Sequence, residues 1–354
     1  MYGDDVAQYD TYSIDNMLSD WFLKPTLEGI VGLQEKQGSV PELEGGIVEP
    51  WTHVECAMAI DAGPYRTEAE KAYRWLADVQ LPDGSWYANY QNGLPRDMYK
   101  VSHAISYIAV GVWHHYLVTA DAKFVRDMWP VVRSAINFIL DMQGPNGEIY
   151  WARDVQGKLY PSAQIASCSS SYLSINCALK MGDFIGEEHR TWMTANDRLR
   201  TAILKMPLPY NPPPDVESIS AFAMDWYYPA LCSVIYGQEA VDRIYDSWDK
   251  FIVHGKGSVC NLEKTWVTAA ETSELAMSLA AHGQYRQAAI VYNWIHHMRD
   301  EDGAYWYGIA YPENEIWPLQ KPSWTSAAVV LAADMLRPES PTSLLLDHHS
   351  KTLL

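Results

Sequence analysis

Gln80-Leu-Pro-Asp-Gly-Ser-Trp-Tyr87 combines a tight turn with an aromatic pair, and the sequence repeats this design twice. The other copies are Gln143-Gly-Pro-Asn-Gly-Glu-Ile-Tyr-Trp151 and Arg299-Asp-Glu-Asp-Gly-Ala-Tyr-Trp306. In each copy, Asp-Gly or Asn-Gly supplies the left-handed backbone that a tight turn requires. A recurring unit of this kind is typical of repeat architectures.

Each of these turns ends an amphipathic helix. In residues 66–79, Ala72, Leu76 and Val79 share one apolar stripe, while the charged residues face away from it. The helices that follow the turns are apolar or small on nearly every side, as in residues 104–113, 273–281 and 326–333. A helix that is apolar all round is buried all round. The sequence therefore predicts amphipathic outer helices that alternate with buried inner helices.

Counting these segments predicts an all-α fold, an (α/α)6 barrel in which six helical hairpins close one toroid over residues 1–354. Inner helices are expected near residues 51–62, 98–119, 163–184, 218–236, 267–282 and 323–337. Outer helices are expected near residues 14–36, 66–80, 122–143, 187–205, 238–253 and 285–299.

Three further segments complete the predicted organisation. Residues 1–37 carry the outer helix that closes the ring, and residues 339–354 form a flexible tail. Residues 207–214 contain five prolines and form a non-helical excursion rather than a domain linker. Strand-like alternation is nearly absent outside the short aromatic loops.

The charge of the chain restricts its partners. The formal net charge is −18 at pH 7, which disfavours nucleic acids and anionic membranes because both would be repelled. No apolar run is long enough to span a membrane, and no signal-peptide pattern begins the chain, so we expect a cytoplasmic protein. The cysteines lack Cys-x-x-Cys spacing and are expected as buried thiols.

The aromatic composition favours a carbohydrate partner. The chain has 15 Trp and 23 Tyr but only 6 Phe. Trp and Tyr carry a polar group at the edge of a flat apolar face. Sugar rings, which have one apolar face and a hydroxyl rim, match that chemistry.

The topology of a toroid predicts where the aromatic residues meet. All loops that lead from an outer helix to the next inner helix lie on one side of the ring, and the aromatic turns are loops of this kind. Such clusters on one face of a rigid scaffold mark a binding site. The aromatic residues expected to contact sugar are Trp51, Trp86, Tyr87, Trp151, Trp226, Trp266, Trp306 and Trp324.

One segment resembles the Gln-Trp repeat of triterpene cyclases and prenyltransferase-like proteins. It runs Trp75-Leu-Ala-Asp-Val-Gln80-Leu-Pro-Asp-Gly84-Ser-Trp86. In that family the repeat is a structural staple. The sequence lacks the cyclase motif Asp-x-Asp-Asp and the metal-binding motif Asp-Asp-x-x-Asp, so a terpene-cyclase role is the weakest of the alternatives.

From about Glu49 to Leu336 the chain resembles a bacterial family often labelled prenyltransferase-like by its fold, and through it the six-hairpin glycosidases. It also resembles the mycobacterial endo-mannosidase that acts on methylmannose polysaccharide. The resemblance implies an inverting hydrolase of an α-linked glycan. It rests on Pro50-Trp-Thr-His-Val-Glu-Cys-Ala-Met-Ala59, Gly111-Val-Trp-His-His115, Tyr150-Trp-Ala-Arg-Asp154, Met224-Asp-Trp-Tyr-Tyr-Pro229, Trp266-Val-Thr-Ala-Ala-Glu-Thr-Ser-Glu274 and Trp324-Thr-Ser-Ala-Ala-Val-Val-Leu-Ala-Ala-Asp334. One position departs from the family, where an acid is expected to follow the first Trp and this chain has Thr52.

Glycoside hydrolysis needs two carboxyl groups that flank one bond. Glu271 begins the fifth inner helix, Glu274 lies one turn further, and Glu55 shares with Glu274 the pattern Glu-x-Ala-Met. Thr268-x-x-Glu271 and Thr52-x-x-Glu55 also match the capping box of a helix start, so a structural role for Glu271 and Glu55 stays open.

Other polar residues are candidates for the same binding site. Asp154 follows an aromatic loop and could serve as the catalytic acid or brace its loop. The candidates for contacts with sugar hydroxyls are His53, Asp97, Arg153 and Asp225. The pairs His114-His115 and His296-His297 are poor chelates, because adjacent residues point to different faces of a helix. No metal is expected, and no Walker or dinucleotide fingerprint indicates a cofactor.

We therefore predict an inverting glycoside hydrolase that acts on an α-linked neutral oligo- or polysaccharide. Glu271 or Glu274 would act as the base, and Glu55 or Asp154 as an acid whose pKa is raised by apolar surroundings. A sugar isomerase or epimerase that uses histidine for proton transfer, and a non-catalytic glycan-binding protein, remain the main alternatives. Neither the oligomeric state nor the sugar is predicted.

Overall fold

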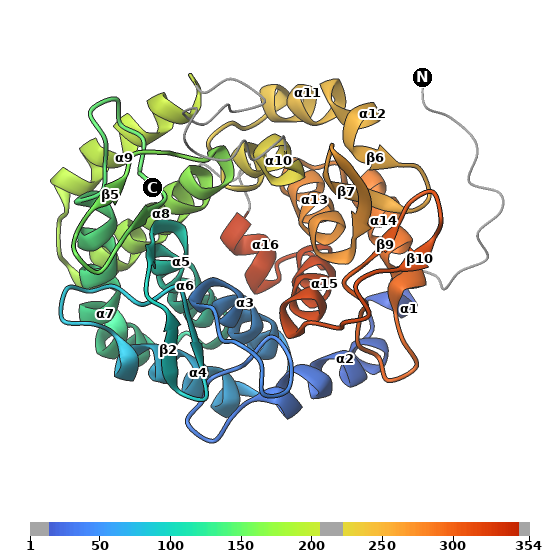
Figure 1. The fold of residues 1–354 in the computed structure, drawn as a ribbon, viewed down its shortest axis with the longest axis horizontal. Helices are drawn as coiled ribbons and strands as arrows, with labels where there is room; N and C mark the ends of the chain where they lie inside the picture. Colours follow the sequence, from blue (N-terminus) through green and yellow to red (C-terminus); the bar gives the residue numbers. More distant parts are fainter. Residues whose placement is uncertain (1–13, 206–221, 347–354) are drawn as a thin grey trace.

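The inner helices of the computed structural model form a closed ring around one axis (Figure 1). Each inner helix packs against the next, and the last, α15, packs against the first, α3. All residues of α13 are buried, as the apolar pattern predicts. The inner helices are α3 (Pro50–Asp61), α5 (Ser102–Ser106) continued by α6 (Ile108–Thr119), α8 (Ile165–Ile185), α10 (Ala223–Leu231), α13 (Ala269–Ala281) and α15 (Ser323–Met335).

The outer helices surround this ring and bury only one face each. The predicted (α/α)6 toroid is confirmed, although the first and fifth outer helices each divide into two pieces and the sixth ends in a 3-10 turn. The outer helices are α1 (Ile14–Met17) and α2 (Asp20–Leu33), α4 (Arg66–Val79), α7 (Ala122–Leu140), α9 (Arg190–Ile203), α11 (Gln238–Asp246) and α12 (Trp248–Phe251), and α14 (Tyr285–Trp294) followed by the 3-10 helix Ile295–Met298.

A recurring staple joins each of several outer helices to the next one. The Gln80 amide donates to the Gly84 carbonyl inside its own turn and to the Val131 carbonyl on α7. Gly84 has a positive φ, and a Cβ at this position would collide with the Ser134 carbonyl. A residue with a side chain would not fit at this position, which explains why the turn has glycine after Asp or Asn.

The same staple occurs at three other places. Gln143 joins its turn to the Ala195 carbonyl on α9, and Gln34, outside the quoted repeats, joins its turn to the Glu68 carbonyl on α4. Arg299 replaces the glutamine in the last copy and donates to the Phe22 carbonyl on α2. The last staple thus ties the sixth outer helix to the N-terminal one and closes the ring.

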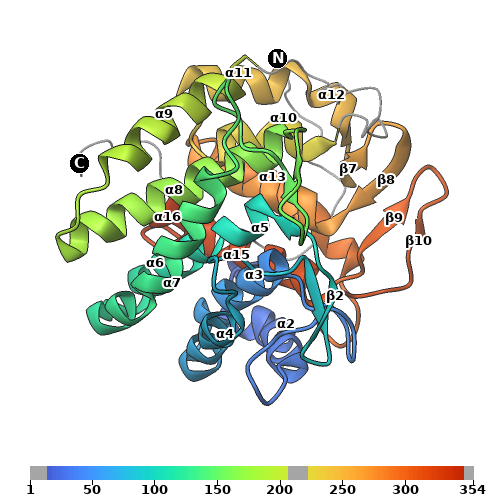
Figure 2. The ribbon, with the colours of Figure 1, turned by 60° about the vertical axis from the view of Figure 1, so that its left-hand side comes forward.

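Short strands lie on one face of the toroid, and most of them were not expected from the sequence. Figure 2 shows β2 and β7–β10 on one side of the ring, opposite the side on which α16 lies. The largest sheet has the order β10-β9-β8-β7-β6 and is antiparallel. The strands are β1 (Asn89–Gln91), β2 (Leu94–Asp97), β3 (Lys100–Val101), β4 (Ala152–Arg153), β5 (Leu159–Tyr160), β6 (Ile252–Val253), β7 (Gly257–Asn261), β8 (Lys264–Thr268), β9 (Gly308–Ala310) and β10 (Glu315–Ile316).

The C-terminal segment differs from the flexible tail that was expected. Residues Pro341–Leu346 form α16, which lies against α6 and α15 near the centre of the ring (Figure 1). Its Leu345 and Leu346 are buried. The structure describes residues 14–205 and 222–346, so the proline-rich stretch 207–214 and residues 347–354 lie outside it. Within the described ranges, no helix has the length and apolarity needed to cross a lipid bilayer.

Candidate active site

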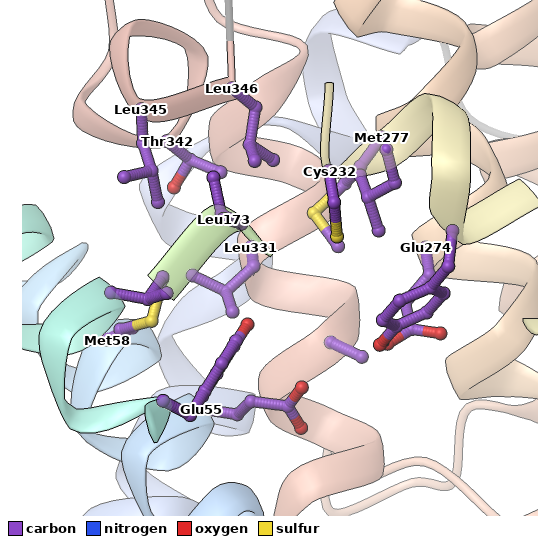
Figure 3. A pocket seen from close by; sticks show the side chains of 15 residues that line it. Glu55, Met58, Leu173, Cys232, Glu274, Met277, Leu331, Thr342, Leu345 and Leu346 are labelled. Carbon is purple, nitrogen blue, oxygen red and sulfur yellow. The ribbon is translucent and has the colours of Figure 1, made fainter. Parts of the chain in front are cut away.

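Two inner helices bring the same side-chain pattern to one cavity at the axis of the toroid. Glu55 and Met58 of α3 line this cavity together with Glu274 and Met277 of α13. Figure 3 shows Glu55 and Glu274 extending from opposite sides toward the same space. Each glutamate is only 8–9% exposed. Two buried acids from different helices therefore face one another, as the shared pattern Glu-x-Ala-Met suggested.

Glu274 is held by two tyrosines of the neighbouring helix α10. The Tyr228 hydroxyl donates to Glu274 Oε1 at 2.5 Å, and the Tyr227 hydroxyl donates to Oε2. Burial raises the pKa of Glu274 to about 7, while the two tyrosine donors oppose that shift. Glu274 is thus poised to change its charge near neutral pH.

Glu55 lacks an equivalent pair of donors and is surrounded by other acids. Burial raises its pKa well above the ordinary value, and the nearby charges of Glu274, Glu49 and Glu271 raise it further, against a smaller opposing effect of Trp51. A buried carboxyl group beside other carboxylates keeps its proton, because a second negative charge in a dry site is costly. Burial and the neighbouring carboxylates therefore both favour the protonated form of Glu55.

Glu271 lies at the third position of α13, one turn above Glu274. The Thr268 hydroxyl donates to Glu271 Oε2, so the pair predicted as a capping box does interact, although no side chain caps the backbone N–H groups. A carboxylate in the first turn of a helix is favoured by the helix dipole. Glu271 is 8% exposed and joins the same acid cluster.

The capping box predicted for Glu55 does not form. Glu49 is the N-cap residue and Pro50 the first residue of α3, so Glu55 lies in the second turn and cannot reach back to the helix start. The Thr52 hydroxyl donates to the Glu49 carbonyl at 3.2 Å. Helix α3 therefore begins two residues before Thr52 instead of at it.

Sequence reasoning did not select Glu49 as a functional residue. Burial, together with the nearby charge of Glu42, raises the pKa of Glu49 to about 8. Its position before Pro50 is typical of an ordinary helix start and conceals this environment. Tyr107, Tyr227 and Tyr228 were also missed, because their hydroxyl groups sit in otherwise apolar helices.

Aromatic side chains surround the acids on the loop face. Trp51 packs against His103 and Tyr228, and Tyr307 lies between Trp266 and Trp324, with ring centroids 4.6 and 4.9 Å away. The aromatic candidates that retain partial exposure are Trp51, Tyr87, Trp151, Trp266, Trp306 and Trp324. On the other side of the toroid, Trp151 packs on Tyr99 and Tyr160. Partly exposed aromatic rings therefore occur in two separate parts of the loop face.

Three predicted sugar contacts lie in the core instead. Trp226 is fully buried, stacks on Phe251 and donates to the Arg243 carbonyl. The Trp86 indole points inward to the Leu76 carbonyl. His53 is fully buried and uses both ring nitrogens, one with Val40 N and the other with the Ala72 carbonyl. These buried side chains cannot contact a ligand bound above the central cavity.

The remaining polar candidates have structural partners. Asp154 Oδ1 accepts from the backbone N–H groups of residues 156 and 158 and so braces the turn between β4 and β5. Arg153 donates to the Asp141 carbonyl and lies over the Phe138 ring. These two residues do not line the central cavity.

Asp225 lies on the inner helix α10, and Asp97 ends the strand β2. The Asp225 carboxylate accepts from Ala166 N at 2.8 Å and thereby caps the start of α8. Asp97 is exposed at the end of β2, and its side chain accepts a hydrogen bond from Tyr99 N. His115 lies deep in the molecule and pairs with Asp61, and no cluster of metal-ligating residues occurs in the segments that the structure describes.

Comparison with known proteins defines the class. No family model matches the chain. Solved structures with the same fold include a glycosidase in complex with glucose, with a TM-score of 0.72, 12% identity, and coverage of 93% of this chain and 99% of the other. A D-mannose isomerase matches with a TM-score of 0.66, 9% identity, and coverage of 91% and 99%. Such low identities show the fold alone.

The sequence comparison goes further. The chain is 41% identical over 318 residues to the MMP endo-(1,4)-3-O-methyl-alpha-D-mannosidase of Mycolicibacterium hassiacum, covering 90% of this chain and 87% of that protein. An uncharacterised glycosyl hydrolase of Methanocaldococcus jannaschii is 31% identical over 84 residues, which is 23% of this chain and 14% of that protein. The chain is a glycoside hydrolase on an (α/α)6 toroid. It belongs to the family of the M. hassiacum endo-mannosidase.

Proposed function

We propose that the protein cleaves internal α-(1,4) linkages of a neutral mannose glycan that carries 3-O-methyl groups. One observation carries this proposal: three buried glutamates from two inner helices form one cluster at the axis, beneath an aromatic rim. The sugar and the linkage are those on which the M. hassiacum relative acts. The net charge of −18 suits a neutral glycan better than an acidic one.

Glu55 is the proposed general acid. An acid catalyst must hold its proton at working pH and release it to the leaving oxygen. The raised pKa of Glu55 keeps it protonated, since burial and the surrounding carboxylates disfavour its charge. Asp154, the other acid considered from sequence, has its carboxylate bonded to its own turn.

Glu271 is the proposed general base. It lies in the first turn of α13, where the helix dipole favours a carboxylate, and the Thr268 hydroxyl fixes its orientation. Glu55 on α3 and Glu271 on α13 come from the two inner helices that flank α15, so the sugar would lie between two acids from different helices. A water activated by Glu271 would attack on the side opposite the leaving group, which gives inversion.

The partly exposed aromatic rings in two parts of the loop face are the proposed surfaces on which sugar rings stack. Trp51 packs against Tyr228, which binds Glu274, Trp266 packs against Tyr307, and Trp151 packs on Tyr99 elsewhere in the ring. An enzyme that cleaves inside a chain must hold sugars on both sides of the broken bond. Stacking surfaces in two parts of the loop face suit that requirement.

The test uses purified protein and synthetic α-(1,4)-oligomannosides with and without 3-O-methyl groups. We expect new reducing ends and shorter products, with the first product formed as the β-anomer in NMR spectra. The Glu271→Gln variant should lose nearly all turnover and still bind the glycan. Unchanged product mass would indicate isomerisation, and binding without any cleavage would indicate a glycan-binding protein. Either result would overturn the proposal.

A further inference from the structure

The cavity beneath the glutamates has a volume of about 30 Å³ and continues away from them toward α16. A single water needs roughly 10–15 Å³, so this space holds a group of one or two heavy atoms and not a sugar ring. Figure 3 shows Thr342, Leu345 and Leu346 on the far side of it from Glu55 and Glu274. The cavity is thus a small extension below the place where the bond would break.

The two ends of the cavity differ in chemistry. Glu55, Glu274, Tyr107 and Tyr228 supply the polar atoms near the acid cluster. The rest of the lining is mainly aliphatic or thioether, and includes Met58, Leu173, Met277, Leu331, Leu345 and Leu346.

The polar side chains toward α16 offer little to a hydroxyl group. The Thr342 hydroxyl is bonded to His114 Nε2 at 3.2 Å, and Cys232 supplies only a thiol, which is a weak hydrogen-bond partner. A sugar hydroxyl placed there would give up its hydrogen bonds to water without strong replacements. A methyl ether has no hydrogen to donate and gains from apolar surroundings. The cavity is therefore suited to an apolar substituent of the sugar.

We propose that this cavity receives the 3-O-methyl group of the mannose residue bound between the catalytic acids, and that Ala328 and Leu331 of α15 set its size. Both residues line the cavity, and they lie one helical turn apart on the same helix. The inference rests on the proposed function, because it takes the methylated mannose from that proposal. It adds the part of the protein that distinguishes a methylated residue from an unmethylated one.

The experiment compares cleavage rates for α-(1,4)-oligomannosides that bear hydroxyl, methoxy or ethoxy groups at O3. Ala328→Leu narrows the cavity, and we expect kcat/KM for the methoxy substrate to fall about 10- to 200-fold relative to the hydroxyl substrate. Leu331→Ala widens the cavity, and we expect the ethoxy substrate to gain at least about 10-fold relative to the methoxy substrate.

Val329→Ala is the matched control. Val329 is buried on the same helix but does not line the cavity, so its truncation should leave the substrate ratios unchanged. Thermal unfolding verifies that each variant is folded, and Leu331→Ala carries the test if Ala328→Leu fails to fold. Suppose that the wild type cleaves the glycans, but the cavity variants change the kcat/KM ratios between substrates no more than Val329→Ala does. This result would overturn the methyl pocket and leave the proposed function standing. A wild-type protein that cleaves none of the glycans would overturn the proposed function.

Discussion

Two inner helices carry the same pattern into the same cavity, yet their glutamates are held differently. Glu55 and Met58 on α3 correspond to Glu274 and Met277 on α13. Tyrosine hydroxyls of α10 donate to both oxygens of Glu274, whose pKa is raised to about 7. Glu55 has no such pair, and its pKa lies well above the ordinary value. The comparison teaches that, between two acids buried to a similar extent, hydrogen-bond donors and neighbouring carboxylates decide which one carries charge more readily.

Removing each carboxylate in turn breaks the comparison most strongly. We expect Glu55→Gln to lower kcat on the glycan by about 10³- to 10⁴-fold, since the amide cannot donate an acidic proton. Glu274→Gln should cost about tenfold and move the alkaline limb of the pH profile to lower pH, because the charge of Glu274 helps to raise the pKa of Glu55. Steady-state kinetics from pH 4 to about 10 would measure both effects. Equal losses from the two variants would contradict the assigned roles.

Removing the tyrosine donors makes the surroundings of Glu274 more like those of Glu55. Tyr227→Phe and Tyr228→Phe should each lower the free energy of unfolding by about 1.5–3 kcal/mol at pH 8, because each removes a hydrogen bond to a charged group. Tyr292→Phe is the matched control, since its buried hydroxyl has no hydrogen-bond partner in the described structure. Denaturant unfolding would test this, and similar losses from all three variants would argue against a special role for the α10 donors.

The pH dependence of stability should reflect the raised pKa of Glu274. Below the unfolded-state pKa near 4.5 the group is protonated in both states, and its contribution is fully present. As the pH rises from there through about 7, the unfolded chain releases its proton first, so stability falls. This decline amounts to roughly 1–3 kcal/mol. Glu274→Gln should flatten it in denaturant unfolding between pH 4.5 and 8; an unchanged slope would mean that Glu274 is ionised in the folded protein.

The methionines should show the smallest difference. Met58 and Met277 occupy matching positions on α3 and α13, and both line the cavity. Met→Leu at either position conserves volume and should change the free energy of unfolding by less than about 1.5 kcal/mol. Thermal unfolding of the two single variants would check this. A much larger loss at only one position would show that the two helices are packed less alike than their sequences.

The sequence was sufficient for the toroid because its signals are local. Gln80 and Gly84 mark one turn, and the apolar surface of each inner helix marks its burial. The related turn at Gln34 was missed, because no aromatic pair follows Gly38. The pairing of β8 with β9 was missed because β9 lies some forty residues further along the chain, so that pairing has no local pattern.

The site was predicted less completely, because a sequence places a residue near a loop without giving the direction of its side chain. Trp86 and Trp226 were expected to contact sugar, as Trp266 was, yet their side chains are buried in the core, whereas Trp266 stays partly exposed. Glu274 was identified because a charge in an apolar helix is costly and needs a reason, whereas Glu55 and Glu271 were identified from their positions near inner-helix starts. Glu49 was not selected, because its position at a helix start does not reveal that its surroundings raise its pKa.

The central claim is that Glu55 donates the proton to the departing sugar oxygen. The most direct measurement compares Glu55→Gln with wild type on two substrates: the natural α-linked glycan, and a 3-O-methylmannoside whose dinitrophenyl group leaves without a proton. We predict a loss of about 10³-fold or more on the glycan and a nearly unchanged rate on the dinitrophenyl substrate. Equal losses on both substrates would show that Glu55 is not the acid.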